Sequence, residues 1–600
     1  MPRTRYQSTL HGNRLSRLPA AALRAVIAGG YTRADLRSDV LAGIVVGVVA
    51  LPLAMALAIA VGVAPQHGLY TAIVAGGLVA LLGGSRMQVS GPTAAFIVIL
   101  APIYTRFGLA GLLMSGLLGG VLLVAMGLGR LGQFIEFIPH PVTTGFTAGI
   151  ATVIATLQLK DFFGLHVTKM PERYFDKVAA LWHARGTVSL VDLGIGCVTL
   201  AILLAVPRLT RRVPGALIAL PIAALLAFAI ERLVPGVTVS TLARRFHTTV
   251  GGRVYDGVPP LPPLPGLPWN AGGPEGQPFT LTFATLRELM PGAFAVAMLG
   301  GIESLLSAVV ADGLSGTRHD PDAELLALGI GNIVTPFFGG IPATGAIART
   351  ATNIRSGARS PVAAVVHSAT VLAAVAALAS LIGTLPMAAM AALLLLVAWN
   401  ISEVKHFGHI LRVAPRSDAV VLLTCFGLTV AFDMVVAVSV GVVLAALLFM
   451  RRMAELTRVS LAGDGQGDPS APAAHPDLPK GVAIYEIAGP LFFGAAQRAT
   501  SGLGAISDRA RVLIIRLDQV PVMDSTGLVA LESALAQLRK LGCQAILCGL
   551  QRQPAELLAR AMIVNAPGRL SISADLAGAV EVARYIVALP PTVTASREST

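Results

Sequence analysis

Between about Val40 and Met450 the chain alternates long apolar segments with short polar joints. This pattern predicts fourteen membrane-spanning segments, most of them long enough for a helix to cross a bilayer. They cover residues 40–62, 68–85, 91–103, 109–128, 141–158, 190–206, 213–232, 289–311, 323–337, 346–355, 361–383, 386–400, 418–432 and 435–450. Because the number is even, both ends of the chain lie on one side of the membrane. The arginine-rich leader, residues 1–38, and the pair Arg451–Arg452 mark that side as the cytoplasm.

Two of these segments, 91–103 and 346–355, are shorter than the ~20 residues that a helix needs to cross the bilayer. Each follows a similar lead-in, LLGGSRMQVSGPTAAF (81–96) in the first half and FFGGIPATGAIART (337–350) in the second. With seven spans in each half, the two copies enter the membrane from opposite sides. This indicates an inverted repeat whose broken helices meet near the midplane. Irregular backbone is tolerated there only when it is buried in protein or lines a cavity.

The two half-helices begin near Ser90–Ala94 and Thr344–Ile347. Their N-termini present free N–H groups and positive dipole ends, so we predict an anion-binding site between them. Arg349 adds a full positive charge on the first turn of the second half-helix. A charge at membrane depth is costly and indicates a functional site. The alternative is a structural role, in which Arg349 snorkels or neutralises Glu303 or the helix end.

After Met450 the composition changes. The transmembrane domain, residues 39–452, is expected to be followed by a linker (453–480) rich in Gly, Pro and Asp, a soluble α/β domain (481–590) and a tail (591–600). Strand-like runs cover 481–493, 511–520 and 544–550, and helix-like stretches cover 495–508, 526–540 and 553–562.

The composition excludes several classes of protein. The chain is 54% hydrophobic and 13% charged, whereas soluble domains carry about 25% charged residues. The net charge of +13 reflects arginines in short loops, so we expect no nucleic-acid partner. The four cysteines are scattered and show neither metal-ligand spacing nor a disulfide framework. No catalytic constellation is visible, so we expect no enzyme activity and no cofactor beyond a coupling ion.

Three segments carry a resemblance to a known family. LPLAMALAIAVGVAPQHGLYTAIVAGGLVALLGGSRMQVSGPTAAF (51–96) resembles the signature of the sulfate permease (SulP) family of anion transporters. GGIESLLSAVVADGLSGTRHD (300–320) and FFGGIPATGAIARTATNIRSGARSP (337–361) resemble the eighth and tenth helices of that family. The resemblance covers about residues 35–590, including a C-terminal STAS domain. It is strongest to the family's bacterial C4-dicarboxylic acid transporters.

The resemblance implies a seven-plus-seven inverted-repeat fold, shared with uracil permeases, with gate and core domains. It also implies a homodimer in the bacterial inner membrane and elevator-type alternating access. Carried over residue by residue, it implies a substrate pocket built by the first, third and tenth helices. The implied pocket residues are Pro52, Met55, Ala56, Ser90, Gly91, Thr93, Ala94, Thr344, Gly345, Ala346, Ala348 and Arg349. Family members often have a hydroxyl directly before the arginine, where this chain has Ala348.

Glu303 is the candidate ion-coupling residue. It lies in the middle of a predicted helix, and Ser307, the second candidate ion-coupling residue, follows one turn later on the same face. An intramembrane carboxylate can bind and release a proton. Family members with sodium coupling tend to have Asp at this position, so Glu303 favours a proton as the coupling ion over Na⁺. The alternative role is a fixed counter-ion for Arg349.

In the soluble domain, VMDSTGL (522–528) resembles the motif of anti-sigma-factor antagonists, in which a serine is phosphorylated. The matching residue is Ser525, at the N-terminal end of a predicted helix, where a phosphate would meet the helix dipole. The alternative is that Asp524 and Ser525 only cap the helix.

These features predict proton-coupled uptake of a small anion, and the resemblance implies that the anion is a C4-dicarboxylate of the succinate, fumarate and aspartate class. A first alternative is transport of sulfate, bicarbonate or chloride by Na⁺ symport or exchange. A second is a membrane sensor that signals through the STAS domain to an unknown cytoplasmic partner. A sensor needs no coupling acid, so Glu303 argues against this alternative.

Overall fold

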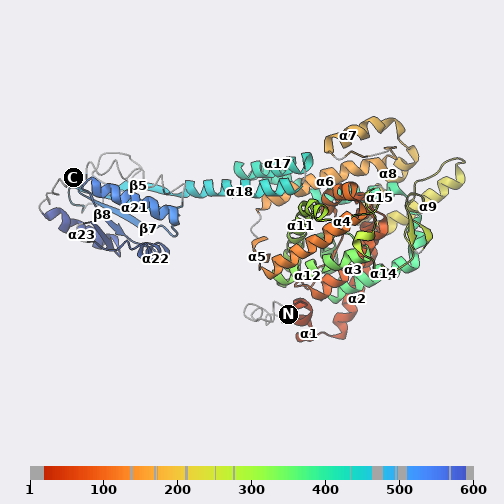
Figure 1. The fold of residues 1–600 in the computed structure, drawn as a ribbon, viewed down its shortest axis with the longest axis horizontal. Helices are drawn as coiled ribbons and strands as arrows, with labels where there is room; N and C mark the ends of the chain where they lie inside the picture. Colours follow the sequence, from red (N-terminus) through yellow and green to blue (C-terminus); the bar gives the residue numbers. More distant parts are fainter. Residues whose placement is uncertain are drawn as a thin grey trace. The chain divides into compact units, whose positions relative to one another are not determined.

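The computed structural model describes most of the chain. The described residues are 19–135, 139–167, 170–171, 173–209, 214–250, 252–274, 277–432, 434–462, 478–492, 496, 510–566 and 569–589. The contacts divide the chain into two compact units, Met1–Val442 and Val443–Thr600. The first unit is helical, and the second contains the large sheet (Figure 1).

All fourteen predicted spans coincide with helices. They correspond to α2 (Arg33–Val61), α3 (Pro65–Leu82), α4 (Ile97–Leu128), α6 (His140–Phe162), α8 (Leu190–Leu209), α9 (Gly215–Leu233), α11 (Phe283–Ser315), α12 (Pro321–Val334), α13 (Ile347–Arg355), α14 (Val362–Gly383), α15 (Met387–Ser402), α17 (Arg416–Ala431) and α18 (Met434–Leu456). Helix α4 accounts for two spans, because Gly108 interrupts it with a φ of 67°. Among the described residues, ten helices are long and apolar enough to cross a membrane.

Shorter elements connect these helices. They are α1 (Ala21–Ala28), α5 (Gly132–Ile135), α7 (Tyr174–His183), α10 (Leu242–Arg245), α16 (Val404–Val413), the hairpin of β2 (His247–Val250) and β3 (Arg253–Asp256), and several 3₁₀ turns, among them η2 (Ala94–Phe96) and η6 (Thr335–Phe338). Of the expected leader, residues 1–38, the structure describes 19–38, and α1 and the first turns of α2 lie there. A capping box of Thr32 and Asp35 starts α2 at Arg33.

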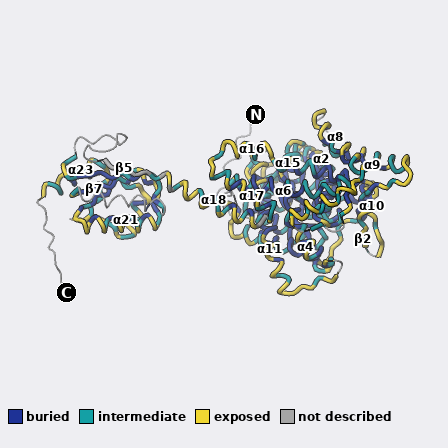
Figure 2. Tube along the Cα trace, turned by 90° about the horizontal axis from the view of Figure 1, so that it is seen from above, coloured by how far each residue is buried: buried dark blue, intermediate teal, exposed yellow. Residues whose placement is uncertain are grey.

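The helices of the first unit form two sets by their packing. We call the helices α2, α3, α4, α11, α12, α13 and α14 the core set, and α6, α8, α9, α15 and α17 the gate set. Close backbone approach is characteristic of the core set: a Cβ on Gly120 of α4 would lie 2.7 Å from the carbonyl oxygen of Gly329 on α12. Buried positions follow α2, α6 and α15, whereas the segments near α8, α9 and β2 are more exposed (Figure 2).

The second unit is an α/β domain with a five-stranded sheet in the order β5-β6-β7-β8-β9. Its strands are β5 (Arg458–Ala462), β6 (Val482–Ala488), β7 (Val512–Gln519), β8 (Gln544–Cys548) and β9 (Leu570–Ser573). Strand β5 is antiparallel to β6, and the other neighbours are parallel. Apolar side chains of α21 (Ser525–Lys540) and α22 (Arg552–Arg560) cover one face, and those of α23 (Leu576–Ala588) cover the other.

This domain differs from the sequence prediction in three places. Strand β5 lies inside the expected linker, 453–480. The prediction missed it because the strand is defined by its pairing with β6, which local composition does not reveal. Strand β9 and helix α23 were not predicted. The predicted helix 495–508 lies outside the described residues, apart from Ala496.

Candidate anion site

The two lead-ins to the broken helices meet as a small antiparallel ladder. Strand β1 (Ser90–Gly91) pairs with β4 (Thr344–Gly345), with Ser90 opposite Gly345 and Gly91 opposite Thr344. The ladder continues where the N–H of Ala346 donates to the carbonyl of Val89 at 2.9 Å. The chain then enters η2 and α4 on one side and α13 on the other. The halves of the repeat therefore bring two half-helix N-termini together, as the sequence predicts.

Arg349 lies at this junction and is buried, with 3% of its surface exposed. Its Nη2 donates to the carbonyl of Pro92, from the other half of the repeat. Its Nε and Nη1 have no hydrogen-bond partner among the described residues. Gly91 makes room for the guanidinium, since a Cβ at this position would lie 2.6 Å from Nη1. Buried donors without partners are costly, so these two nitrogens are suited to an anionic ligand.

Glu303 lies on α11, and its Oε2 accepts a hydrogen bond from Thr93 Oγ1 at 2.9 Å. The carboxylate and the guanidinium of Arg349 attract each other electrostatically. No ion pair within 4.0 Å joins them in the part of the chain that the structure describes. Glu303 is therefore held by a hydroxyl of the third span, and it is not in direct contact with the cation.

Ser307, the other candidate ion-coupling residue, lies close to a hydroxyl of α13. Its Oγ lies 3.1 Å from Thr350 Oγ1 on α13, and Thr350 Oγ1 accepts the N–H of Val89 at 3.0 Å. The structure places the hydroxyl of Ser307 against the base of α13, where it supports the ladder. The one-turn spacing from Glu303 does not place it in hydrogen-bond contact with that carboxylate.

The remaining predicted pocket residues have varied surroundings. Pro52, Met55 and Ala56 are buried on α2, which packs against both α4 and α13. The hydroxyl of Thr344 donates to the carbonyl of Gly300 at 2.8 Å, so it braces α11. The residues Ala94, Gly345 and Ala346 are buried, Ala348 is exposed, and Ser90 Oγ is buried without a hydrogen-bond partner among the described residues.

Sequence reasoning missed a buried carboxylate beneath the site. Glu324 of α12 is 1% exposed. It accepts hydrogen bonds from the backbone N–H groups of Gly84 and Ser85 at 3.0 and 3.1 Å, and from Gln88 Nε2 at 2.9 Å. Gln88 also donates to Ser304 Oγ at 2.6 Å. Glu324 thus holds the lead-in to β1 against α11 and α12; its one sequence signal is an acid inside an apolar segment.

A cavity of about 380 Å³ lies elsewhere, and its lining residues do not include Arg349 or Glu303. The ends of α6, α8 and α15 meet there, and Arg245 pairs with Asp161 at 2.6 Å on its wall. This cavity is separate from the ladder.

In the α/β domain, the motif around Ser525 begins helix α21. Asp524 Oδ1 accepts the N–H of Gly527 at 2.7 Å, which is an N-terminal cap. Ser525 is the first residue of the helix and is exposed. The cap is present, and the serine hydroxyl is accessible.

The paired half-helices and the buried cation define a multi-pass membrane transporter for anions. The chain belongs to the sulfate permease family, whose model matches residues 36–425, and a STAS domain model matches residues 476–576. Members of this family are transporters, so the chain is not an enzyme.

Similar proteins place the chain within the family. It is 39% identical to the Bacillus subtilis protein YvdB, whose name associates it with sulfate transport, over 85% of this chain and 90% of YvdB. It is 28% identical to the bicarbonate transporter BicA of Picosynechococcus sp., over 79% and 82% of the two chains. The transmembrane domain of a cyanobacterial BicA aligns with a TM-score of 0.57 at 26% identity, covering 69% of this chain and 97% of that one.

The fold over nearly the whole chain is that of murine Slc26a9, an anion transporter solved in the inward-facing state. The TM-score is 0.78 at 19% identity, and 97% of this chain and 96% of that chain are covered. The names of these relatives refer to sulfate, bicarbonate and anions. They do not support the C4-dicarboxylate prediction.

Proposed function

We propose that this chain is a secondary active transporter of a compact oxyanion, with sulfate and bicarbonate as the first candidates. The observation that carries the proposal is the environment of Arg349. It is the only buried arginine or lysine in the described part of the chain, and two of its nitrogens, Nε and Nη1, have no hydrogen-bond partner there. Buried guanidinium donors that lack a partner favour a negatively charged ligand that can accept their hydrogen bonds. The relatives named for sulfate and bicarbonate support the same choice.

A C4-dicarboxylate is the second candidate. The resemblance of residues 51–96 favours it. Its second carboxylate needs a second set of donors away from Arg349, and no other arginine or lysine is buried in the described residues. The single cation therefore favours an anion with one charged centre.

The proposal includes Glu303 as the coupling carboxylate, with a proton as the coupling ion. The positive charge of Arg349 stabilises the negative charge of Glu303 across the site. A bound anion offsets that positive charge, so proton binding to Glu303 and anion binding to Arg349 favour each other. This linkage gives symport, and uptake should rise as the external pH falls.

The proposal also includes the oligomeric state, the membrane location and the regulation of the transporter. It works as a homodimer in the bacterial plasma membrane, with both termini cytoplasmic and with elevator-type movement of the site. Ser525 of the STAS domain is a candidate phosphorylation site for an unknown cytoplasmic partner. Its exposure at the start of α21 supports accessibility to a kinase.

The test is uptake of labelled sulfate into proteoliposomes without Na⁺, with unlabelled bicarbonate and succinate as competitors. We expect uptake that an inward proton gradient stimulates and that bicarbonate inhibits more strongly than succinate does. Glu303→Gln should remove the pH dependence. Glu288→Gln is the matched control, because Glu288 lies on the same helix in an exposed pair with Arg106.

The other outcomes are informative. Uptake of succinate that sulfate does not inhibit would replace the oxyanion with the dicarboxylate. If the uptake rate of Glu303→Gln depends on pH as strongly as that of the wild type, Glu303 is not the coupling residue. Folded protein that takes up none of the three anions would reject transport and favour the sensor alternative.

A further inference from the structure

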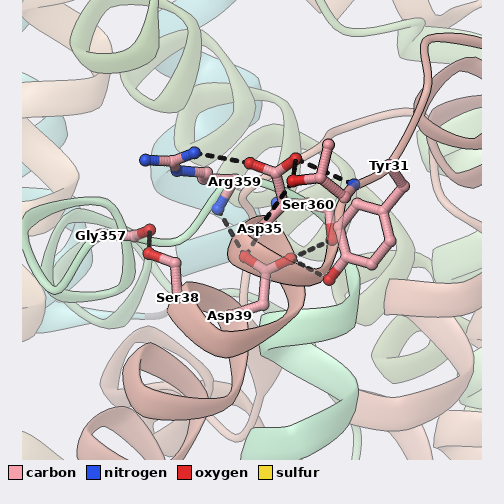
Figure 3. A network of polar contacts seen from close by, with 8 residues as sticks. Tyr31, Asp35, Ser38, Asp39, Gly357, Arg359 and Ser360 are labelled. Atoms are coloured by element: carbon pink, nitrogen blue, oxygen red, sulfur yellow. Dashed lines mark hydrogen bonds and ion pairs between the residues drawn. The ribbon is translucent and has the colours of Figure 1, made fainter.

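A second buried carboxylate, Asp39, lies near the start of α2 and has no exposed surface. Its Oδ1 accepts the backbone N–H groups of Arg359 at 2.6 Å and Ser360 at 3.2 Å. Its Oδ2 accepts the hydroxyl of Tyr31 at 2.7 Å and the hydroxyl of Ser360 (Figure 3). Four donors thus satisfy this buried carboxylate. Burial, and then the bond to Asp39, raise the pKa of Tyr31 to about 12, so its hydroxyl remains a donor.

Two further contacts join the same segments. Ser38 Oγ donates to the carbonyl of Gly357 at 2.6 Å, and Arg359 Nη1 pairs with Asp35 Oδ1 at 2.6 Å (Figure 3). We call these seven residues the Asp39 clamp: Tyr31, Asp35, Ser38, Asp39, Gly357, Arg359 and Ser360. The clamp joins the start of α2 to the connection between α13 and α14.

The clamp lies at the far end of the half-helix that carries Arg349. Helix α13 has nine residues, which corresponds to a length of about 13 Å. It contains neither Gly nor Pro, so it should move as a rigid rod. Arg349 is its third residue, about 9 Å along the axis from its last residue, Arg355. A shift of the clamped end therefore displaces the guanidinium.

The segment before α2 also contacts the first lead-in. The N–H groups of Ala20 and Ala22 donate to the carbonyls of Leu82 and Gly83 at 2.6 and 3.2 Å. Leu82 is the last residue of α3, after which the chain runs to β1. Residues 20–39 thus contact both the start of the first lead-in, at Leu82 and Gly83, and the segment that follows α13.

We propose that Tyr31 and Asp39 are positioning residues for Arg349, and that the Asp39 clamp sets the affinity of the site for its anion. The guanidinium occupies a confined space between Gly91 and Pro92. In such a space a small displacement of α13 changes the direction of the unpaired N–H groups on Nε and Nη1. The inference rests on the anion site of the proposed function, but not on which anion is carried.

The first test measures KM and Vmax of the full-length chain in proteoliposomes, for an anion that the wild type transports. Tyr31→Phe and Ser38→Ala should each raise KM about three- to tenfold, the range expected for one lost hydrogen bond. Vmax per folded molecule should change less than twofold. Tyr255→Phe in the β2–β3 hairpin is the matched control and should leave KM unchanged. A purely structural role would reduce the yield of folded protein and leave KM unchanged, which would overturn the inference.

The second test asks whether the effect passes through Arg349. In an Arg349→Lys background, Tyr31→Phe should change KM less than twofold, because the guanidinium fork is already absent. A full three- to tenfold effect in that background would overturn the inference.

A third measurement separates the clamp from the proposed function. In hydrogen exchange, Tyr31→Phe should increase exchange at residues 347–352 as well as at 356–361. If the wild type transports no tested anion, the proposed function fails while this readout still decides the role of the clamp. Faster exchange confined to 356–361 would show that the clamp acts only locally, and the inference would fail.

Discussion

The substitution Gly91→Ala should displace the guanidinium of Arg349. Gly91 lies in β1 with a φ of +154°, a conformation that favours glycine. A Cβ at this position would stand 2.6 Å from Arg349 Nη1. Ordinary van der Waals contact begins at 3.4 Å, so the guanidinium must move by about 0.8 Å. The neighbouring bond from Nη2 to the carbonyl of Pro92 cannot be retained without rearrangement.

Two energies set the size of the effect. Holding a non-glycine residue in this backbone region costs about 1–3 kcal/mol, which lowers stability. Losing one charge-assisted hydrogen bond at the site costs about 1.5–3 kcal/mol. If the loss of this hydrogen bond weakens anion binding by the same free energy, the affinity falls about ten- to a hundredfold. The thermal midpoint should fall by a few degrees.

The assay is anion uptake with KM and Vmax determined separately, together with a thermal unfolding curve of the detergent-purified chain. Gly77→Ala on α3 is the control, because a Cβ there meets nothing closer than 3.7 Å. We expect wild-type KM for Gly77→Ala and a raised KM for Gly91→Ala. A Gly91→Ala variant that is folded and has the wild-type KM would refute the placement of Arg349 in the anion site.

Two further predictions concern other buried groups. Glu324→Ala leaves the N–H groups of Gly84 and Ser85 without their acceptor. Each unsatisfied buried N–H lowers the stability by about 1–3 kcal/mol, so the thermal midpoint should fall. An unchanged midpoint would contradict this role of Glu324. Burial raises the pKa of Cys543 and of Cys548 to about 11. Both thiols should therefore resist iodoacetamide at pH 8 in the folded full-length chain and react after unfolding in urea. Because unfolded thiols ionise near pH 9, the free energy of unfolding of this domain should decrease as pH rises from 9 towards 11.

The apolar spans and the two broken helices could be predicted because their signals are local. The two short spans and their Gly-rich lead-ins are visible in the letters of residues 81–96 and 337–350. Opposite entry then places their ends together, and the structure pairs Ser90 with Gly345. Each of these steps needs only segment length, composition and the parity of the spans.

The contacts that hold the site could not be predicted, because their partners lie far apart in the sequence. Thr93 and Glu303 are separated by 210 residues, and Gln88 and Glu324 by 236. In sequence, Glu324 resembles an ordinary acid in the first turn of a helix, where carboxylates are common. Its burial appears only when the turn after α3 packs onto α12. Helical spacing places Ser307 on the same face as Glu303, but it does not specify the partner of either side chain.

The distribution of contacts favours movement of the whole site as one body. The β1–β4 ladder, the bond from Thr93 to Glu303 and the bond from Val89 to Thr350 join the two halves of the repeat inside the core set. A mechanism that separates the halves would have to break all three. Between the helices of the core set and those of the gate set, by contrast, the described side chains make no hydrogen bond with each other. An interface without directional bonds can slide at low cost, since no polar group loses its partner. The arrangement thus supports the proposed elevator movement, in which the core set carries Arg349, Glu303 and the anion past the gate set.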